Sequence, residues 1–148
     1  MSERAAIDSH VGTPAVRFTQ VRGPSVARER YKVRIDRCDS FQVACVSGEL
    51  PIELFVSMLH VLGIESEGGD PSMLMDVREL STIYSANDLV RVGQEIAVSF
   101  LHLERLALLV SPLRRMRISE RTARSTGMNM CVFDTEEDAV AWAHRSDQ

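Results

Sequence analysis

Hydroxyl side chains gather in one short stretch, LMDVRELSTIYSAND, where a serine at the start of a helix could accept a phosphate. The stretch begins with apolar residues that end at Asp76. The hydroxyl residues Ser81, Thr82 and Ser85 follow. Ser85 and Asp88 have the spacing of a capping box, in which the hydroxyl and the carboxylate each bind a backbone N–H of the first helical turn. A phosphate on Ser85 would face the positive end of the helix dipole.

Two interpretations of Ser85 remain open, a helix cap alone and a cap that is also a phosphoacceptor. The cap alone is favoured, because a phosphate there would meet the carboxylate of Asp88 one turn away. Ser81 and Thr82 are weaker candidates in the same switch loop. Asp76 is expected to cap the loop or to pair with Arg78, since the acidic pair and the lysine of a response-regulator receiver are missing.

Arginines recur every three or four residues in one later segment, so their guanidinium groups are expected to share a helix face. They are Arg114, Arg117, Arg121 and Arg124. A solvated face is the favoured interpretation. The alternative is a surface for an anion or an acidic partner, because guanidinium forks suit phosphate and carboxylate. Nucleic acid is disfavoured by the net charge of −4 and the 5% content of aromatic residues.

No catalytic or metal-binding constellation is found in the sequence. The histidines are His10, His60, His102 and His144. They lie on different predicted elements without metal-ligand spacing, and no glycine-rich phosphate loop or G-x-S-x-G elbow is present. The sequence therefore predicts neither an enzyme nor a cofactor or metal. Three cysteines without a C-x-x-C pair favour reduced thiols in the cytoplasm.

The 148 residues are enough for one domain with a substantial core. Residues 1–29 mix Gly, Pro and Arg without a sustained period and are expected to form a flexible arm, with 30–148 as the domain. A short extra strand or partner-binding segment carrying Val16, Phe18 and Val21 is the alternative. No apolar run approaches the roughly 18 residues of a membrane span, and no signal peptide is recognised.

Hydrophobic periodicity predicts two strands and then alternating helices and strands. Alternation at Tyr31, Val33 and Ile35, and again at Phe41, Val43 and Cys45, predicts an antiparallel hairpin with these residues inward. Later strands are expected at 73–77, 105–110 and 128–133. The order is β-β-α-β-α-β-α-β-α, an α/β fold whose sheet is parallel after the hairpin.

Capping signals set the expected ends of the helices. Pro51 is placed in the first turn of the first helix and Gly63 at its end. The second helix begins at Ser85. Ser111 and Pro112 are expected to open the third, and Gly127 to end it. The pair Asp134 and Glu137 matches a capping box for the last helix.

The sequence resembles the SpoIIAA-like, STAS-domain family of anti-sigma-factor antagonists. The likeness is carried by YKVRID, VSGEL, LMDVREL, RLALLV and VFDTEEDAVAWA, in this order, over residues 31 to 144. The resemblance implies a mixed sheet covered by helices. It also implies a phosphoacceptor serine after the third strand, which falls on Ser85, although Tyr84 and Ala86-Asn87 depart from the family's Asp-Ser-Ser-Gly stretch.

The expected function is that of a non-catalytic bacterial regulatory module in the cytoplasm, which binds a protein partner such as an anti-sigma factor or kinase. The alternative is a small apolar-ligand or lipid-binding domain of the CRAL-TRIO type. That alternative requires an open cavity of about 300 Å³ or more beneath the first two helices. The oligomeric state is left undetermined by the sequence.

Overall fold

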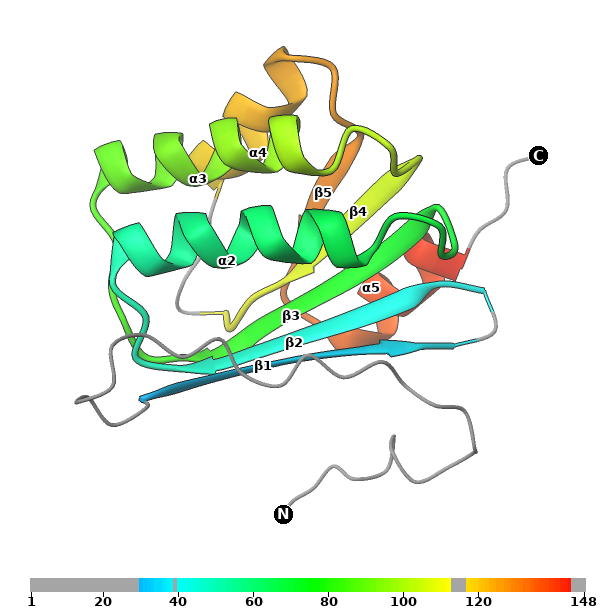
Figure 1. Cartoon of the computed structure of the whole chain (residues 1–148), viewed down its shortest axis with the longest axis horizontal. Helices are drawn as coiled ribbons and strands as arrows, with labels where there is room; N and C mark the ends of the chain where they lie inside the picture. Colours follow the sequence, from blue (N-terminus) through cyan, green and yellow to red (C-terminus); the bar gives the residue numbers. More distant parts are fainter. Residues whose placement is uncertain (1–29, 39, 113–116, 145–148) are drawn as a thin grey trace.

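The computed structural model describes residues 30–38, 40–112 and 117–144, which form one five-stranded sheet with helices on both faces (Figure 1). The strands are β1 (Tyr31–Arg37), β2 (Gln42–Gly48), β3 (Ser72–Leu80), β4 (Arg105–Leu109) and β5 (Met130–Phe133). The helices are α2 (Ile52–Glu65), α3 (Ala86–Ser99), α4 (Arg117–Ser125) and α5 (Glu136–His144).

The strand order in the sheet is β1-β2-β3-β4-β5, so each strand lies beside its predecessor in the chain. The β1–β2 pair is antiparallel, and the other three pairs are parallel. Right-handed crossovers that always advance in the same direction must put α2, α3 and α4 on one face. In Figure 1, α2 and α3 lie side by side on that face, whereas α5 lies behind the sheet and contacts β3, β4 and β5.

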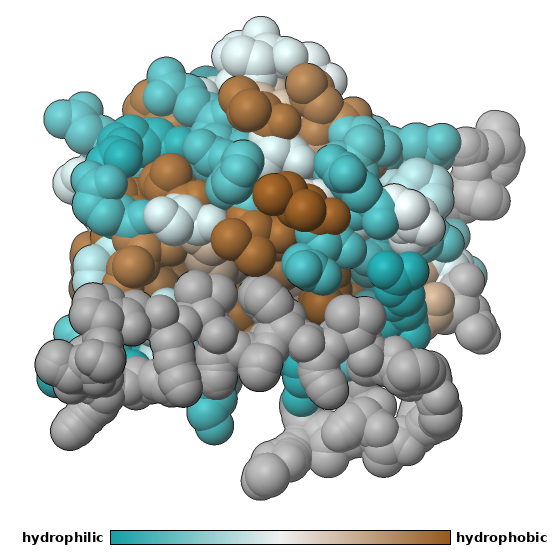
Figure 2. Space-filling model, in the orientation of Figure 1, coloured by the Kyte–Doolittle hydropathy of each residue, from teal (hydrophilic) through white to brown (hydrophobic). Residues whose placement is uncertain are grey.

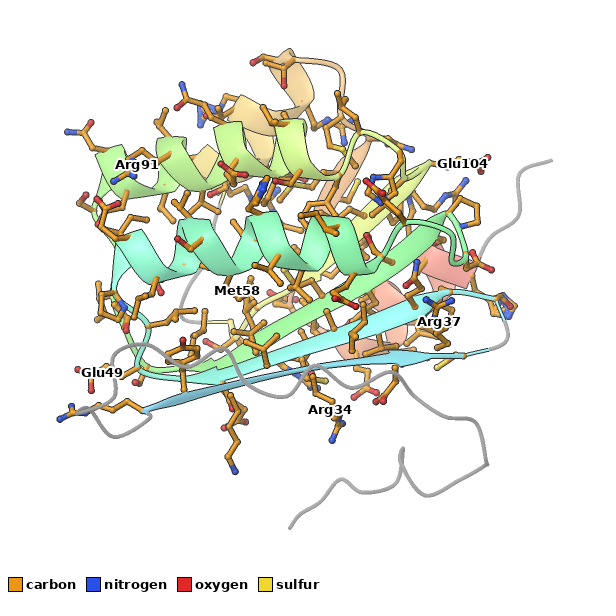
Figure 3. All side chains as sticks on the ribbon, viewed as in Figure 1. Arg34, Arg37, Glu49, Met58, Arg91 and Glu104 are labelled. Carbon is orange, nitrogen blue, oxygen red and sulfur yellow. The ribbon has the colours of Figure 1, made fainter. Side chains whose placement is uncertain are left out.

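The main core lies between the sheet and the layer formed by α2, α3 and α4. Alternate residues of β1 (Tyr31, Val33 and Ile35) point into it. Helix α2 contributes Phe55, Met58, Leu59 and Leu62, all nearly inaccessible to solvent. Figure 3 labels Met58, which lies between α2 and the sheet. Burial of this continuous apolar cluster is the main source of stability for the domain.

A smaller cluster fixes α5 to the opposite face of the sheet. Leu74 and Leu109 pack there with Ala139 and Ala143 of the helix. Three polar contacts strengthen the docking. The Ser72 hydroxyl donates to the Ala143 carbonyl at 2.6 Å. Arg105 donates to the Trp142 carbonyl at 2.9 Å and lies over the indole ring, 5.2 Å from its centroid. Helix α5 is thus held to the sheet by apolar packing and by side-chain bonds to its last turn.

The order of the nine predicted elements is confirmed, but the prediction for β2 was wrong in its faces. Gln42, Ala44 and Val46 are the buried residues, while Val43 and Cys45 lie half-buried on the α5 side. The buried Gln42 amide donates to the carbonyls of Ser66 and Asp70, at 3.2 and 2.7 Å. Because Gln42 is polar, nothing in the sequence indicated that the even-numbered residues of β2 face the main core.

Two of the predicted helix ends are corrected by the structure. Gly63 lies inside α2, which continues to Glu65, instead of ending it. Helix α5 is capped by Thr135, whose hydroxyl accepts the Asp138 N–H at 3.3 Å, and not by Asp134. Gly127 follows α4 with φ of 101°, as expected of a helix stop. The predicted arm, residues 1–29, lies outside the described residues.

Candidate functional site

The loops that follow β2 and β3 lie at the same end of the sheet, because β2 and β3 are parallel and their carboxyl ends point the same way. Three hydrogen bonds join them. The Ser81 N–H donates to the Gly48 carbonyl at 2.9 Å. The Leu50 N–H donates to the Thr82 hydroxyl at 2.8 Å, and the Tyr84 hydroxyl donates to the Leu50 carbonyl at 2.6 Å. The loop from Ser81 to Ser85 is therefore fixed at several points.

Ser85 is the N-cap of α3 and forms the predicted capping box. Its hydroxyl accepts the Asp88 N–H at 3.0 Å, and its own N–H donates to the Asp88 carboxylate at 3.3 Å. The side chain of Ser85 is exposed to solvent. The arrangement satisfies two backbone donors of the first turn and leaves the hydroxyl accessible to a partner.

Ile83 is the most exposed large apolar residue of the described chain, with 80% of its surface accessible. It lies between Thr82 and Tyr84, whose hydroxyl groups bind the β2–α2 loop. The Tyr84 ring also packs on Phe55 of α2, with ring centroids 5.2 Å apart. An anchored loop thus presents an apolar side chain to water two residues before an accessible serine. Sequence analysis missed Ile83, although an apolar residue in a polar loop was a signal.

Beside this loop, an ion pair joins the first turn of α2 to the second turn of α3. Arg91, labelled in Figure 3, donates two hydrogen bonds to the Glu53 carboxylate, at 2.8 and 3.1 Å. These hydrogen bonds lower the pKa of Glu53 and raise that of Arg91. The two residues are 38 positions apart, so no local spacing in the sequence could have indicated the pair.

Asp76 lies away from the Ser85 loop, on the opposite face of the sheet. Its neighbours Met75 and Val77 belong to the main core, so the Asp76 side chain points toward α5. The Arg78 guanidinium binds the Asp76 carboxylate at 3.0 and 2.8 Å and reaches Glu136 of α5 at 3.4 Å. The hydrogen bonds that Arg78 donates to the Asp76 carboxylate raise the pKa of Arg78 above its ordinary value. Asp76 therefore holds Arg78 against α5.

The arginines of α4 make different contacts. Arg117 pairs with Glu120 at 3.2 Å. Arg124 donates to the Met130 carbonyl at 2.6 Å and contacts the sulfur of Cys131 at 3.4 Å. Arg121 is exposed and makes no ion pair with any described residue. Arg114 lies outside the described residues. Of the four arginines predicted to share a helix face, Arg124 is thus bound to strand β5 and does not point freely into solvent.

The apolar-ligand alternative requires a cavity beneath α2 and α3. Side chains there, including Phe55, Leu59, Leu62 and Ile96, form a continuous cluster and are at most 1% exposed. An open hollow of about 330 Å³ lies instead on α4, lined by Ile118, Arg121, Thr122 and Ser125. Its position on the outer helix differs from the one that the alternative specifies.

Residues 30–38, 40–112 and 117–144 contain no group of three or more His, Cys, Asp or Glu side chains arranged to hold a metal ion. None of the helices in these ranges is long and apolar enough to cross a membrane.

Comparisons with known proteins place the fold. No protein-family model and no curated protein sequence matches the chain. An anti-sigma factor antagonist from Mycobacterium paratuberculosis is similar in structure, with a TM-score of 0.53 and 14% sequence identity over 78% of this chain and 95% of its own. An uncharacterised DUF3478-family protein with a SpoIIAA-like fold, from Shewanella loihica PV-4, has a TM-score of 0.47 and 19% identity over 82% and 99%. The chain therefore shares the α/β fold of the anti-sigma factor antagonist from Mycobacterium paratuberculosis.

Proposed function

We propose that the protein is a non-catalytic, cytoplasmic regulatory module that binds a protein partner through the Ser81–Ser85 loop. The observation that carries the proposal is the exposure of Ile83 on a loop fixed by hydrogen bonds to Gly48 and Leu50. An apolar side chain on a loop held in one position loses little entropy on binding, and the buried core of an interface is more apolar than the rest of the protein surface. The similarity in fold to an anti-sigma factor antagonist supports a regulatory partner such as an anti-sigma factor or kinase.

Phosphorylation of Ser85 is the proposed switch of this surface. A phosphate adds a charge of about −1.5 to −2. It would replace the hydroxyl that accepts the Asp88 N–H and would be repelled by the carboxylate of the same residue. Arg91, one turn further along α3, is already bound to Glu53. The modification would therefore weaken the first turn of α3 and disturb the loop, which makes the unmodified protein the binding form.

Arg121 offers a second contact for an acidic group of the same partner. Its guanidinium is exposed on α4 beside Ile118 and Thr122. Arg117 and Arg124 are less suited, because they bind Glu120 and the Met130 carbonyl. Arg114, the first of the four arginines that the sequence predicts on one helix face, belongs to the same proposal.

Site-specific photo-crosslinking in the native cell tests the partner surface. A photoreactive amino acid is placed at Ile83 and, as the matched control, at Asn129, which is exposed at the opposite edge of the sheet. The proposal expects one defined protein adduct from position 83 that position 129 does not give. Equal adducts from both positions, or none from position 83, would contradict it.

Mass spectrometry of the purified native protein tests the switch. Phosphate mapped to Ser85, together with loss of the position-83 adduct in the Ser85→Glu variant, is the expected result. A Ser85 that stays unmodified across growth conditions while the adduct persists leaves the interaction surface intact and removes the switch.

A further inference from the structure

Large apolar side chains are exposed where α2 and α3 end. Ile64 lies in the last turn of α2, Val98 lies in the last turn of α3, and Leu101 follows that helix. Their exposed fractions are 55%, 70% and 64%, and we call these three residues the end patch. Figure 2 shows apolar surface that extends over α2 between hydrophilic side chains. The helix layer thus exposes apolar area that its filled core does not use.

Two side-chain contacts hold the ends of α2 and α3 side by side (Figure 1). The His60 Nδ1 atom lies 3.7 Å from the Glu95 carboxylate, and the Ser66 hydroxyl lies 2.8 Å from His102 Nε2. The patch residues of both helices lie between these two contacts along the chain. They therefore border the same boundary between the helices, and because they are exposed they point out of the layer. The end patch is one surface and not a set of isolated side chains.

The support beneath the end patch is fixed. Ser66 is the C-cap of α2, is 1% exposed and donates its hydroxyl to the Gly63 carbonyl at 2.9 Å. Phe100, the C-cap of α3, is fully buried in the main core. The loops that follow the two helices are joined by the Glu104 N–H, which donates to the Pro71 carbonyl at 2.7 Å. A partner that binds here therefore orders little of the backbone.

The charge around the end patch has one sign. Residues 38–77 and 92–104 contain no Lys or Arg. Neither α2 nor α3 has a basic residue in its last turn, so the carbonyl end of each helix dipole adds negative potential. The arginines that flank the second range are engaged, Arg91 with Glu53 and Arg105 with the Trp142 carbonyl. The exposed acidic residues of these turns and loops are Glu65, Glu67 and Glu104, the last of which Figure 3 labels.

We propose that the end patch binds a basic amphipathic helix of a protein partner. The apolar face of such a helix covers Ile64, Val98 and Leu101, and its Lys or Arg side chains face the surrounding carboxylates. The site is separate from the Ser81–Ser85 loop, because the 14 residues of α3 place its two ends about 20 Å apart. The protein can therefore contact one partner at each end of the helix layer.

NMR titration of the isotope-labelled full chain with a synthetic peptide tests the proposal. The probe is a helical peptide of leucine and lysine with its leucines on one face, and the control peptide has glutamate in place of every lysine. The lysine peptide is expected to shift the amide signals of Ile64, Val98 and Leu101 and to bind at least about tenfold more tightly than the glutamate peptide. Its affinity should fall as salt is added, because exposed charges are screened.

Variants at exposed positions separate the apolar and the charged parts of the site. Val98→Ser should weaken binding of the lysine peptide by about tenfold, since the lost apolar contact is not replaced. The double variant Glu65→Lys, Glu67→Lys should weaken it by a similar factor through repulsion. Ile83→Ser is the matched control, because it removes an exposed apolar side chain at the other end of the helix layer and should leave the affinity unchanged.

Three results would overturn the proposal. The first is equal binding of the two peptides, or binding of neither. The second is an affinity for the lysine peptide that Val98→Ser leaves unchanged. The third is self-association of the unaltered chain in sedimentation experiments that Val98→Ser abolishes, which would assign the end patch to a second copy. The amide of Met75 in the central strand β3 reports in each case that the domain is folded.

Discussion

Gly63 of α2 lies directly against the backbone of Ser99 in α3. A Cβ atom added to Gly63 would stand 2.4 Å from the Ser99 carbonyl oxygen and 2.9 Å from its Cβ. Gly93 makes a similar approach to the Ser119 carbonyl, at 2.6 Å, one helix further along the layer. Glycines thus allow α2, α3 and α4 to pack more closely than larger residues would permit. The contact between Gly63 and Ser99 joins the C-terminal ends of α2 and α3.

Replacement of Gly63 by alanine is expected to destabilise the fold by about 1–3 kcal/mol, because the new methyl group meets backbone that cannot rotate away. The intrinsic helix propensity of alanine acts in the opposite direction and is the smaller effect. Urea unfolding measures the change. Ser57→Ala, at an exposed position of the same helix, should alter stability by less than about 0.5 kcal/mol. A stable Gly63→Ala protein would mean that the helices can separate at little cost.

Loss of the Ser85 cap is expected to cost about 1 kcal/mol, since the Asp88 N–H loses its acceptor in Ser85→Ala. Ser85→Thr keeps a hydroxyl and should recover most of the loss. Ser81→Ala serves as the control, because only the backbone of Ser81 is bonded in the loop. Equilibrium unfolding of the three variants makes the comparison. Equal stability of Ser85→Ala and Ser81→Ala would rule out an energetic role for the cap.

Glu120→Ala should destabilise the protein by about 1–3 kcal/mol, because the Val132 N–H at the β5 edge is left without its acceptor. Glu120→Gln retains an oxygen at that position and should lose much less. Arg117→Ala separates the two roles of Glu120, since it removes the ion pair but leaves the bond to β5 intact. Thermal unfolding of the set ranks them. If Arg117→Ala were as damaging as Glu120→Ala, the ion pair and not the edge bond would be responsible.

The Glu53–Arg91 pair should make a contribution to stability that disappears in acid. Hydrogen bonding to Arg91 lowers the pKa of Glu53 below its ordinary value of 4.5. A carboxyl group whose pKa is depressed by folding stabilises the folded state fully above its unfolded pKa, and that stabilisation is lost as the pH falls through the folded pKa. Carboxyl NMR titration of Glu53 should give a midpoint below 4.5 that returns toward it in Arg91→Ala. An unchanged midpoint in this variant would show that the pair is not formed in solution.

Elements whose signal is local were predictable from the sequence. The alternation of Tyr31, Val33 and Ile35 predicted β1, and the spacing of Ser85 and Asp88 predicted the start of α3. Both signals depend only on residues a few positions apart in the sequence. The candidate site was partly predictable for the same reason. Its serine and capping carboxylate belong to one turn of helix.

Features that depend on distant contacts could not be predicted. Gly63 resembles a helix stop until Ser99 is known to lie against it. Gln42 looks like an outward residue until the carbonyls of Ser66 and Asp70 are found beside it. Ile83 gains its significance from the hydrogen bonds that hold its loop to distant residues, such as the bond from the Leu50 N–H to the Thr82 hydroxyl, which joins residues 32 positions apart. In each case the deciding partner is brought close only by the crossover connections.

The strand order β1-β2-β3-β4-β5 has a consequence for synthesis of the protein. Because each strand pairs with the one made immediately before it, the sheet can grow in the direction of translation. Helix α5 is the exception, since the last turn must find Ser72 across 71 residues. We expect nascent chains that end before α5 to hold a formed but unsealed sheet, whose apolar face at Leu74 and Leu109 is exposed to chaperones until the final helix leaves the ribosome.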